Sequence, residues 1–176
     1  MRILREEAVA LVVDYQEKLV PVKIEKELLI WHSQILLQGL KILDVPMIIT
    51  QQYTKGLGTT VEDITAAIGT EAYVEKISFS AYEQVKEQIQ GKKFVIVCGI
   101  EAHICVLQTV IDLAAAGYIP VVVEDCISSR KKYDKKIALE RMKQEGAMIT
   151  TTESLLFELL REAGTDTSKK IQRLIK

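Results

Sequence analysis

The segment from Lys93 to Gly117 constrains the fold of this chain more than any other stretch. It begins with a short apolar run, Phe94 to Cys98, and breaks at Gly99. It then continues as a long apolar stretch from Ala102 to Ala116. Apolar runs of these lengths, with little charge, predict a buried strand, a tight turn and a buried helix.

The rest of the chain repeats this alternation of strand and helix. Strands are predicted over Ala8 to Val13, Val45 to Thr50, Tyr73 to Lys76, Phe94 to Cys98, Tyr118 to Val123 and Ala147 to Thr150. Helices are predicted over Glu25 to Asp44, Thr59 to Ile68, Ala81 to Gln90, Ala102 to Ala116, Tyr133 to Glu145 and Thr152 to Glu162. Six alternating strands predict a three-layer α/β/α fold, with a parallel sheet covered by helices on both faces.

Length and composition narrow the class of protein. With 176 residues and no linker or repeat, the chain is expected to form one domain, 1–176. A net charge of -1 gives no general attraction to nucleic acid or anionic membrane. No apolar run is long enough to span a bilayer, and the charged N-terminus does not resemble a signal peptide. A cytoplasmic protein is therefore expected.

Cysteine and histidine usage narrows the chemistry further. The three cysteines, Cys98, Cys105 and Cys126, form no CxxC pair, so reduced thiols are expected. The two histidines, His32 and His103, argue against a His-rich metal site. The loop from Lys55 to Gly58 lacks the spacing of a phosphate-binding loop.

Three chemically active side chains stand where predicted strands end. Asp14 follows the first strand, Lys76 ends the third, and Cys105 lies in the first turn of the helix after the fourth. The carboxyl ends of parallel strands line the ligand crevice of an open α/β sheet, so the three are expected to meet there. Simpler interpretations stand beside this one: Asp14 could cap a loop, Lys76 could be a solvated surface residue, and buried cysteines are usually inert.

Together these side chains form a complete set for nucleophilic catalysis. A helix N-terminus and a nearby ammonium both favour the thiolate of Cys105, which predicts a lowered thiol pKa. A carboxylate can accept the thiol proton or orient the lysine. Attack on an amide carbon creates an oxyanion, for which the backbone N–H groups between Gly99 and Cys105 are natural donors.

A set of short motifs, ordered along the chain, resembles the isochorismatase-like cysteine hydrolase superfamily, which includes nicotinamidases. The motifs are Asp14-Tyr15-Gln16, Glu75-Lys76 with Phe79-Ser80, Gly99 to Thr109, Glu124-Asp125 with Ser128-Ser129, and Thr151 to Phe157. The stretches QQYTKGLG and GIEAHIC are most similar to the isochorismatase domain-containing proteins.

The resemblance implies the strand order 3-2-1-4-5-6 and the roles of the site residues. It implies Asp14 as general base, Lys76 as stabiliser of the thiolate and transition state, and Cys105 as nucleophile. It also implies a cis peptide between Ile100 and Glu101, which would direct the Glu101 N–H into the oxyanion hole beside that of Cys105.

The same resemblance implies which residues surround the substrate. Gln16 would brace the site through backbone hydrogen bonds, and Gln51, Tyr53, Phe79 and His103 would stand around the pocket. Ordinary core packing is an equally good interpretation of Phe79, and a pocket wall or a turn hydrogen bond suits His103 better than catalysis.

One departure from the family pattern bears on the substrate. Nicotinamidases hold a metal through an acid and histidines after the second strand, whereas this chain has Gln51-Gln52-Tyr53 there. No metal and no cofactor are therefore expected. The prediction is a cysteine hydrolase that cleaves a small amide through a thioester, in a homo-oligomer as is usual for the family.

Two other classes of function remain open. In a thiol redox protein Cys105 would be oxidised and Cys98 would have to resolve it, although a strand and turn separate them. A non-catalytic interaction module would keep the fold without the chemistry. It predicts that Cys105 is no more reactive than Cys98 or Cys126.

Overall fold

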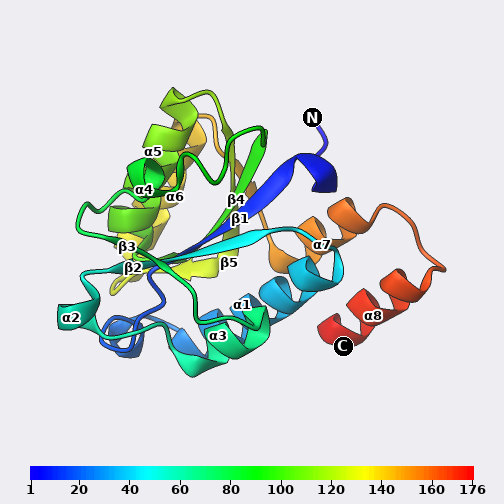
Figure 1. Cartoon of the computed structure of the whole chain (residues 1–176), viewed down its shortest axis with the longest axis horizontal. Coiled ribbons are helices and arrows are strands. Elements are labelled where there is room, and N and C mark those ends of the chain that lie inside the picture. The colour runs from blue at the N-terminus through cyan, green and yellow to red at the C-terminus, as the bar shows by residue number, and fades with distance from the viewer.

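Six strands form one parallel sheet in the computed structural model, which describes residues 1–176 (Figure 1). The strands are β1 (Ala8–Val13), β2 (Met47–Gln52), β3 (Val74–Lys76), β4 (Phe94–Ile100), β5 (Ile119–Ser128) and β6 (Met148–Thr150). Their order across the sheet is β3-β2-β1-β4-β5-β6, which confirms the predicted order. The direction of winding reverses between β1 and β4, and this is where parallel α/β sheets open a crevice at the strand carboxyl ends.

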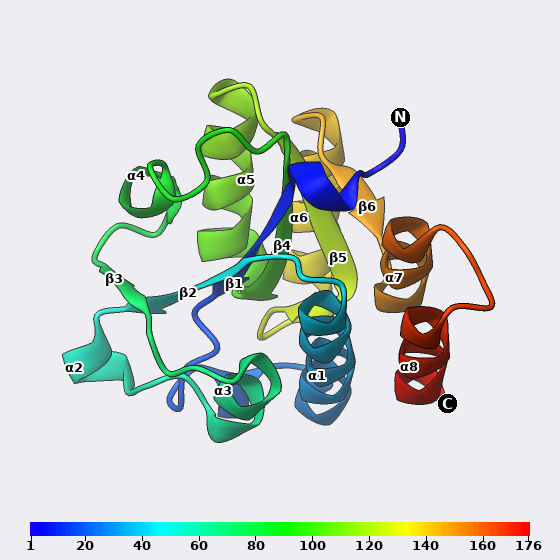
Figure 2. The ribbon, with the colours of Figure 1, turned by 45° about the vertical axis from the view of Figure 1, so that its right-hand side comes forward.

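Helices cover both faces of the sheet and confirm the three-layer fold (Figure 2). One face packs against α1 (Lys26–Ile42), α3 (Glu62–Ile68), α7 (Thr152–Leu160) and α8 (Asp166–Ile175). The other face packs against α4 (Tyr82–Val85), the π-helical turn η3 (Ala102–Val106), α5 (Leu107–Ala115) and α6 (Lys132–Gln144). Three short elements complete the chain: η1 (Arg5–Glu7), η2 (Val20–Val22) and α2 (Thr54–Leu57).

The continuous apolar runs of β1 and β4 follow from burial of both faces. In β1, Val9, Leu11 and Val13 face the α5 side, while Ala8, Ala10 and Val12 face the α1 side. Side chains alternate along a strand, so a strand covered on both faces must be apolar at every position. Each fully buried valine or leucine contributes roughly 1.5–3 kcal/mol, which makes these central strands the main source of stability.

Gly99 allows the ends of β1 and β4 to approach each other. Its φ is +129°, and a Cβ atom at this position would lie 2.1 Å from the Val13 carbonyl oxygen. No L-side chain fits that space or favours that φ. Glycine therefore lets the chain turn from β4 toward Cys105 directly beside the residue that precedes Asp14.

The structure corrects several predicted boundaries. Strand β5 runs on to Ser128, so Glu124, Asp125 and Cys126 belong to the strand and not to the following loop. A shift in its pairing with β4 between Val97 and Gly99 accommodates the extra length. The helix after β4 begins as the π-helical turn η3, and the helix predicted over Ala81 to Gln90 is reduced to the single turn α4.

Two further features lie on the α1 side of the molecule. The polar C-terminal stretch forms α8, a helix of 10 residues that lies along α1 and buries Ile171. Trp31 of α1 is 51% exposed, and Leu28 of the same helix is 54% exposed. No helix in the structure has both the length and the apolar character needed to cross a membrane.

Candidate active site

Asp14 and Lys76 form a buried ion pair at the carboxyl ends of β1 and β3. Asp14 Oδ2 lies 2.7 Å from Lys76 Nζ, and both side chains are 0% exposed. The Thr50 hydroxyl donates to Asp14 Oδ1 at 2.8 Å. Apart from the Lys76 ammonium, Oδ2 has no hydrogen-bond partner within the chain, so its remaining lone pair can accept a proton. Lys76 is buried, so the interpretation of this residue as a solvated surface lysine is wrong.

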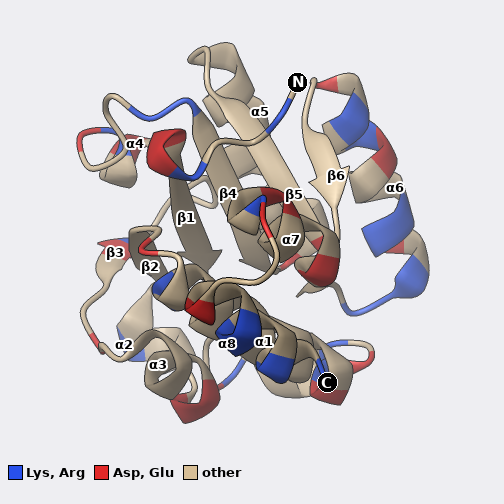
Figure 3. Cartoon of the chain, turned by 90° about the vertical axis from the view of Figure 1, so that its right-hand side faces the viewer, with Lys and Arg blue, Asp and Glu red and all other residues tan.

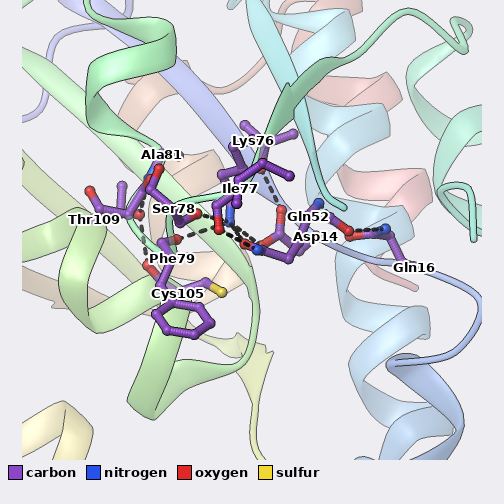
Figure 4. Close-up of polar contacts among 12 residues, drawn as sticks. Asp14, Gln16, Gln52, Lys76, Ile77, Ser78, Phe79, Ala81, Cys105 and Thr109 are labelled. Carbon is purple, nitrogen blue, oxygen red and sulfur yellow. Dashed lines mark hydrogen bonds and ion pairs between the residues drawn. The ribbon is translucent and has the colours of Figure 1, made fainter. Parts of the chain in front are cut away.

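Lys76 is held by acceptors on three sides (Figure 4). Its ammonium donates to Gln52 Oε1 at 2.7 Å, to the Phe79 carbonyl at 2.9 Å and to the Ser78 carbonyl at 3.2 Å. A buried charge is tolerated only when it is paired and hydrogen-bonded, and this ammonium is both. Its position is therefore fixed before any substrate arrives.

Cys105 lies in η3, with its side chain facing Asp14 and Lys76. The residue is 6% exposed, and both charged groups stand close enough to shift the pKa of its thiol. Thr109 fixes the backbone here: its hydroxyl donates to the Cys105 carbonyl at 2.7 Å and accepts from the Ala81 N–H at 2.9 Å. The structure thus brings together the three residues that the sequence singled out.

The protonation of Cys105 differs from the prediction. Burial raises the pKa of the thiol to about 12; the Asp14 carboxylate adds to the rise and the Lys76 ammonium opposes it. The prediction of a lowered pKa was wrong, because it counted the helix terminus and the lysine but not burial and the carboxylate. Burial also raises the pKa of the Asp14 carboxyl, against the opposing effects of Lys76 and Thr50.

The Glu101 backbone presents a free donor near the nucleophile. The peptide bond between Ile100 and Glu101 is cis, as the resemblance implied. The Glu101 carbonyl accepts hydrogen bonds from the N–H groups of Ile104 at 3.0 Å and Val106 at 3.2 Å, whereas the Glu101 N–H donates none within the chain. It is therefore available to an oxygen atom of a ligand.

Gln16 and Gln51 hold the loop that follows β2 in place. Gln16 is buried; it donates to the carbonyls of Gln52 and Gly58 and accepts from the Gln52 N–H, which is the bracing role that was expected. Gln51 donates to the Thr60 hydroxyl at 2.9 Å and accepts from Thr54 at 2.9 Å. It lines a cavity of about 370 Å³ that does not include Cys105, so its placement favours loop support over substrate contact.

The remaining predicted pocket residues are more exposed. Tyr53 is 50% exposed and Phe79 is 52% exposed, so the interpretation of Phe79 as core was wrong. Figure 4 shows the Phe79 ring on the same side of the site as the Cys105 sulfur. His103 Nδ1 lies 2.9 Å from the hydroxyl of Ser129, just after β5, and its Nε2 lies 4.0 Å from Asp134. This is a long-range contact and not the local turn hydrogen bond that was predicted.

Sequence reasoning missed several residues that complete the site. Thr50 and Gln52 stand at the end of β2, and their position after an apolar run was the available signal. Lys23 was missed altogether; its ammonium lies 2.6 Å from Glu101 Oε1 in a second buried ion pair. Nothing in the local sequence around Lys23 marks it, because its partner is far away in the chain.

The other two cysteines lie apart from the site. Cys98 packs in the core on the α1 face of the sheet, whereas Cys105 packs on the α5 face. Both Cys98 and Cys126 are fully buried, and burial raises the thiol pKa of each. Resolution of an oxidised Cys105 by Cys98 would require the chain to pass through the sheet, which argues against the redox alternative. No group of three or more His, Cys, Asp or Glu side chains could hold a metal ion.

Fold and site define a parallel α/β protein with an acid, a lysine and a cysteine gathered at its switch point. Residues 8–154 match the isochorismatase domain. The chain belongs to the isochorismatase domain family, and hence to the isochorismatase-like hydrolase superfamily.

Its relatives include isochorismatase domain-containing protein 2A of Mus musculus, 37% identical over 178 residues that cover 99% of this chain and 85% of the relative. Secreted isochorismatase effector Isc1 of Phytophthora sojae is 36% identical over 183 residues, which cover 99% and 87%.

Two solved structures extend the comparison. The MAR1 ribonuclease of Caenorhabditis elegans aligns with a TM-score of 0.94 and 34% identity, over 99% of this chain and 92% of that one. The YcaC gene product of Escherichia coli, described as an octameric hydrolase of unknown specificity, aligns with a TM-score of 0.86 and 25% identity, over 92% and 83%.

Proposed function

We propose that the protein is a cysteine hydrolase that cleaves the C–N bond of a small amide through a thioester intermediate. One observation carries the proposal: a fully buried Asp14–Lys76 ion pair, 2.7 Å long, stands against the Cys105 thiol. A buried ion pair contributes little net stability, so its presence at a switch point favours a chemical role.

The first half-reaction begins with a neutral thiol. Asp14 Oδ2 accepts the thiol proton as the sulfur attacks the amide carbon, the C–S bond forms, and the carbonyl electron pair moves onto oxygen. The free Glu101 N–H, together with the Cys105 N–H, donates to this oxyanion. When the tetrahedral intermediate collapses, the C–N bond breaks and protonated Asp14 gives its proton to the departing amine.

The second half-reaction releases the acid. A water molecule attacks the thioester carbon while Asp14 accepts one of its protons. Collapse then breaks the C–S bond, and the leaving sulfur takes the proton back from Asp14 as the carboxylic acid departs. The complete cycle begins and ends with the thiol protonated, in keeping with the raised pKa of Cys105.

Lys76 supplies the electrostatic component. Its ammonium lies 2.7 Å from Asp14 and acts on the Cys105 thiol, where it favours the anionic form. As negative charge passes from the carboxylate to the sulfur, the positive charge remains in contact with both. A charge held in place in a water-poor site stabilises such a transfer without reorganisation.

The test is to trap the acyl group. A panel of small amides and activated esters is incubated with the wild type, with Cys105→Ala and with Cys126→Ala as a matched control. Hydrolysis and a covalent acyl adduct on Cys105 are expected in the wild type and the control and not in Cys105→Ala. Turnover that survives in Cys105→Ala would contradict the assignment.

A second candidate function comes from the neighbour named a ribonuclease. Helix α6 carries several Lys and Arg residues along its length (Figure 3), and a groove of about 420 Å³ beside α6 is lined by lysines, glutamates and apolar side chains. The lysines are Lys132, Lys135, Lys136 and Lys143. Lys132 pairs with Glu25 and Lys135 pairs with Glu124, and these glutamates weaken the electrostatic attraction of the groove for RNA. Cleavage of a labelled RNA, abolished by Cys105→Ala and suppressed by salt, would favour this candidate.

Assembly and location complete the proposal. We infer a homo-oligomer because the Escherichia coli neighbour is described as octameric and because the large apolar side chains Leu28 and Trp31 of α1 are both about half exposed. Mass photometry should show a species larger than a monomer, and Trp31→Glu should shift it toward monomer. Three free cysteines suit a reducing, cytoplasmic compartment.

A further inference from the structure

A second buried ion pair, between Lys23 and Glu101, lies at the same edge of the sheet and has no place in the catalytic steps above. We propose that Lys23 and Glu101 are positioning residues that hold the Glu101 N–H in place as the oxyanion donor. The inference rests on the proposed function and extends it to Lys23, which lies in the short connection between η2 and α1 and contributes no group to the chemistry.

The geometry of the pair indicates a constraint. Lys23 Nζ lies 2.6 Å from Glu101 Oε1, and the two side chains are 1% and 9% exposed. Removing two charges from water costs several kcal/mol each, so such a pair is weak evidence for stability. A fixed geometry is what it can provide, because a buried charge that leaves its partner is left uncompensated.

Glu101 is anchored through two of its three polar groups. Its carbonyl accepts from the N–H groups of Ile104 and Val106. Its carboxylate receives Lys23 at 2.6 Å and the Nε–H of Arg130 at 3.1 Å. Only its N–H is left without a partner. A peptide held at its oxygen and at its side chain presents that N–H in one direction.

Lys23 is itself tied to the sheet. The Ile24 N–H donates to the Ser129 carbonyl at 3.0 Å, and the Ser128 hydroxyl donates to the Ile24 carbonyl at 2.9 Å. The Lys23 N–H donates to the Val20 carbonyl at 3.1 Å. The ammonium therefore approaches Glu101 from a segment fastened to the end of β5. Arg130, whose side chain is 58% exposed, is the weaker of the two restraints.

Loss of Lys23 should therefore affect one kind of reaction at Cys105 and spare another. Acylation by p-nitrophenyl acetate passes through an oxyanion and needs the donor. Alkylation by iodoacetamide displaces iodide at a saturated carbon and forms no oxyanion. Loss of one oxyanion donor costs about 10²–10³ in rate. Lys23→Met should lower the acylation rate of Cys105 by a large part of that factor, and it should change the alkylation rate of Cys105 by less than about threefold.

The experiment measures both rates on the full-length protein at one pH. Acylation is followed by p-nitrophenolate release and by the mass of the Cys105 peptide, and alkylation by the same peptide. Lys132→Met is the matched control, because Lys132 also pairs with a glutamate, at 2.9 Å, but on the exposed surface. Lys23→Arg should restore part of the acylation rate, since it keeps the charge.

Folding of the variants is checked by circular dichroism. If Lys23→Met does not fold, the double variants Lys23→Met/Glu101→Gln and Lys23→Met/Glu101→Met take its place, because removing both charges of the pair leaves neither ion without its partner. These variants should fold and still acylate slowly.

The outcomes separate the inference from the function on which it rests. A folded Lys23→Met or double variant with an unchanged ratio of acylation to alkylation would overturn the positioning role alone. A wild type that is not acylated on Cys105 would overturn the proposed function, and the positioning role with it. A selective loss of acylation, absent in Lys132→Met, supports both.

Discussion

Cys105 should be slow to alkylate in the native protein, in contrast to most cysteine nucleophiles. Burial and the Asp14 carboxylate raise the pKa of the thiol to about 12 from its ordinary value of 9.0. Iodoacetamide reacts only with the thiolate. The native protein should therefore resist labelling at neutral pH even though the side chain lies at the site.

The size of the effect follows from that pKa. A thiol that titrates at about 12 in place of 9.0 has roughly a thousandfold smaller thiolate population at pH 8. Asp14→Asn removes the negative charge and should lower the thiol pKa, which raises the alkylation rate at pH 8 by at least about tenfold. Lys76→Met removes the opposing positive charge and should lower the rate further.

The assay is iodoacetamide labelling between pH 7 and 10, read for each cysteine by mass spectrometry. Wild-type Cys105 should gain about tenfold in rate per pH unit with no plateau. The same protein unfolded in urea supplies the baseline for an ordinary thiol. Cys98 and Cys126 serve as internal controls, since both are fully buried.

Two results would refute this reasoning. A plateau with a midpoint below about 8.5 would mean that the lysine and the helix terminus outweigh burial. An Asp14→Asn variant that labels more slowly than the wild type would mean that the carboxylate promotes the thiolate at rest, and that the raised pKa is not set by its charge.

Three further predictions concern stability and are checked by urea unfolding. Lys76→Met should cost about 3–5 kcal/mol because it leaves Asp14 charged and buried, and Asp14→Asn in the same chain should recover much of that loss. Gly99→Ala should lower the free energy of unfolding by at least about 3 kcal/mol, because the added Cβ atom has no space. Gly91→Ala, which has open space around it, should lower it by only about 1 kcal/mol, for its positive φ. Equal losses in the two variants would contradict the close approach of Gly99 to Val13. The free energy of unfolding should fall as pH rises from about 9 toward 12, because the folded chain holds its buried thiol protons, that of Cys98 up to about 12, while the unfolded chain loses them near 9. Cys98→Ala should make this fall less steep, and an unchanged slope would exclude that thiol as a contributor.

Much of the fold could be predicted from local sequence because the burial of a strand or helix determines which of its positions are apolar. The apolar runs of β1 and β4 must be buried on both faces, and the alternation of strands with helices leaves a parallel sheet as the consistent arrangement. The predicted boundaries of β5, α4 and η3 were wrong. These boundaries depend on strand pairing and turn geometry, which involve residues far apart in the sequence.

The sequence by itself also placed Asp14, Lys76 and Cys105 at the ends of strands, and parallel strands end at a common edge. Their electrostatic state was decided by tertiary structure. The pKa of Cys105 depends on how much solvent is excluded and on how closely Asp14 approaches, and neither quantity is written in the spacing of residues. The pairing of Lys23 with Glu101 was likewise invisible, because the two are separated by 78 positions and only the folded sheet brings their charges within 2.6 Å.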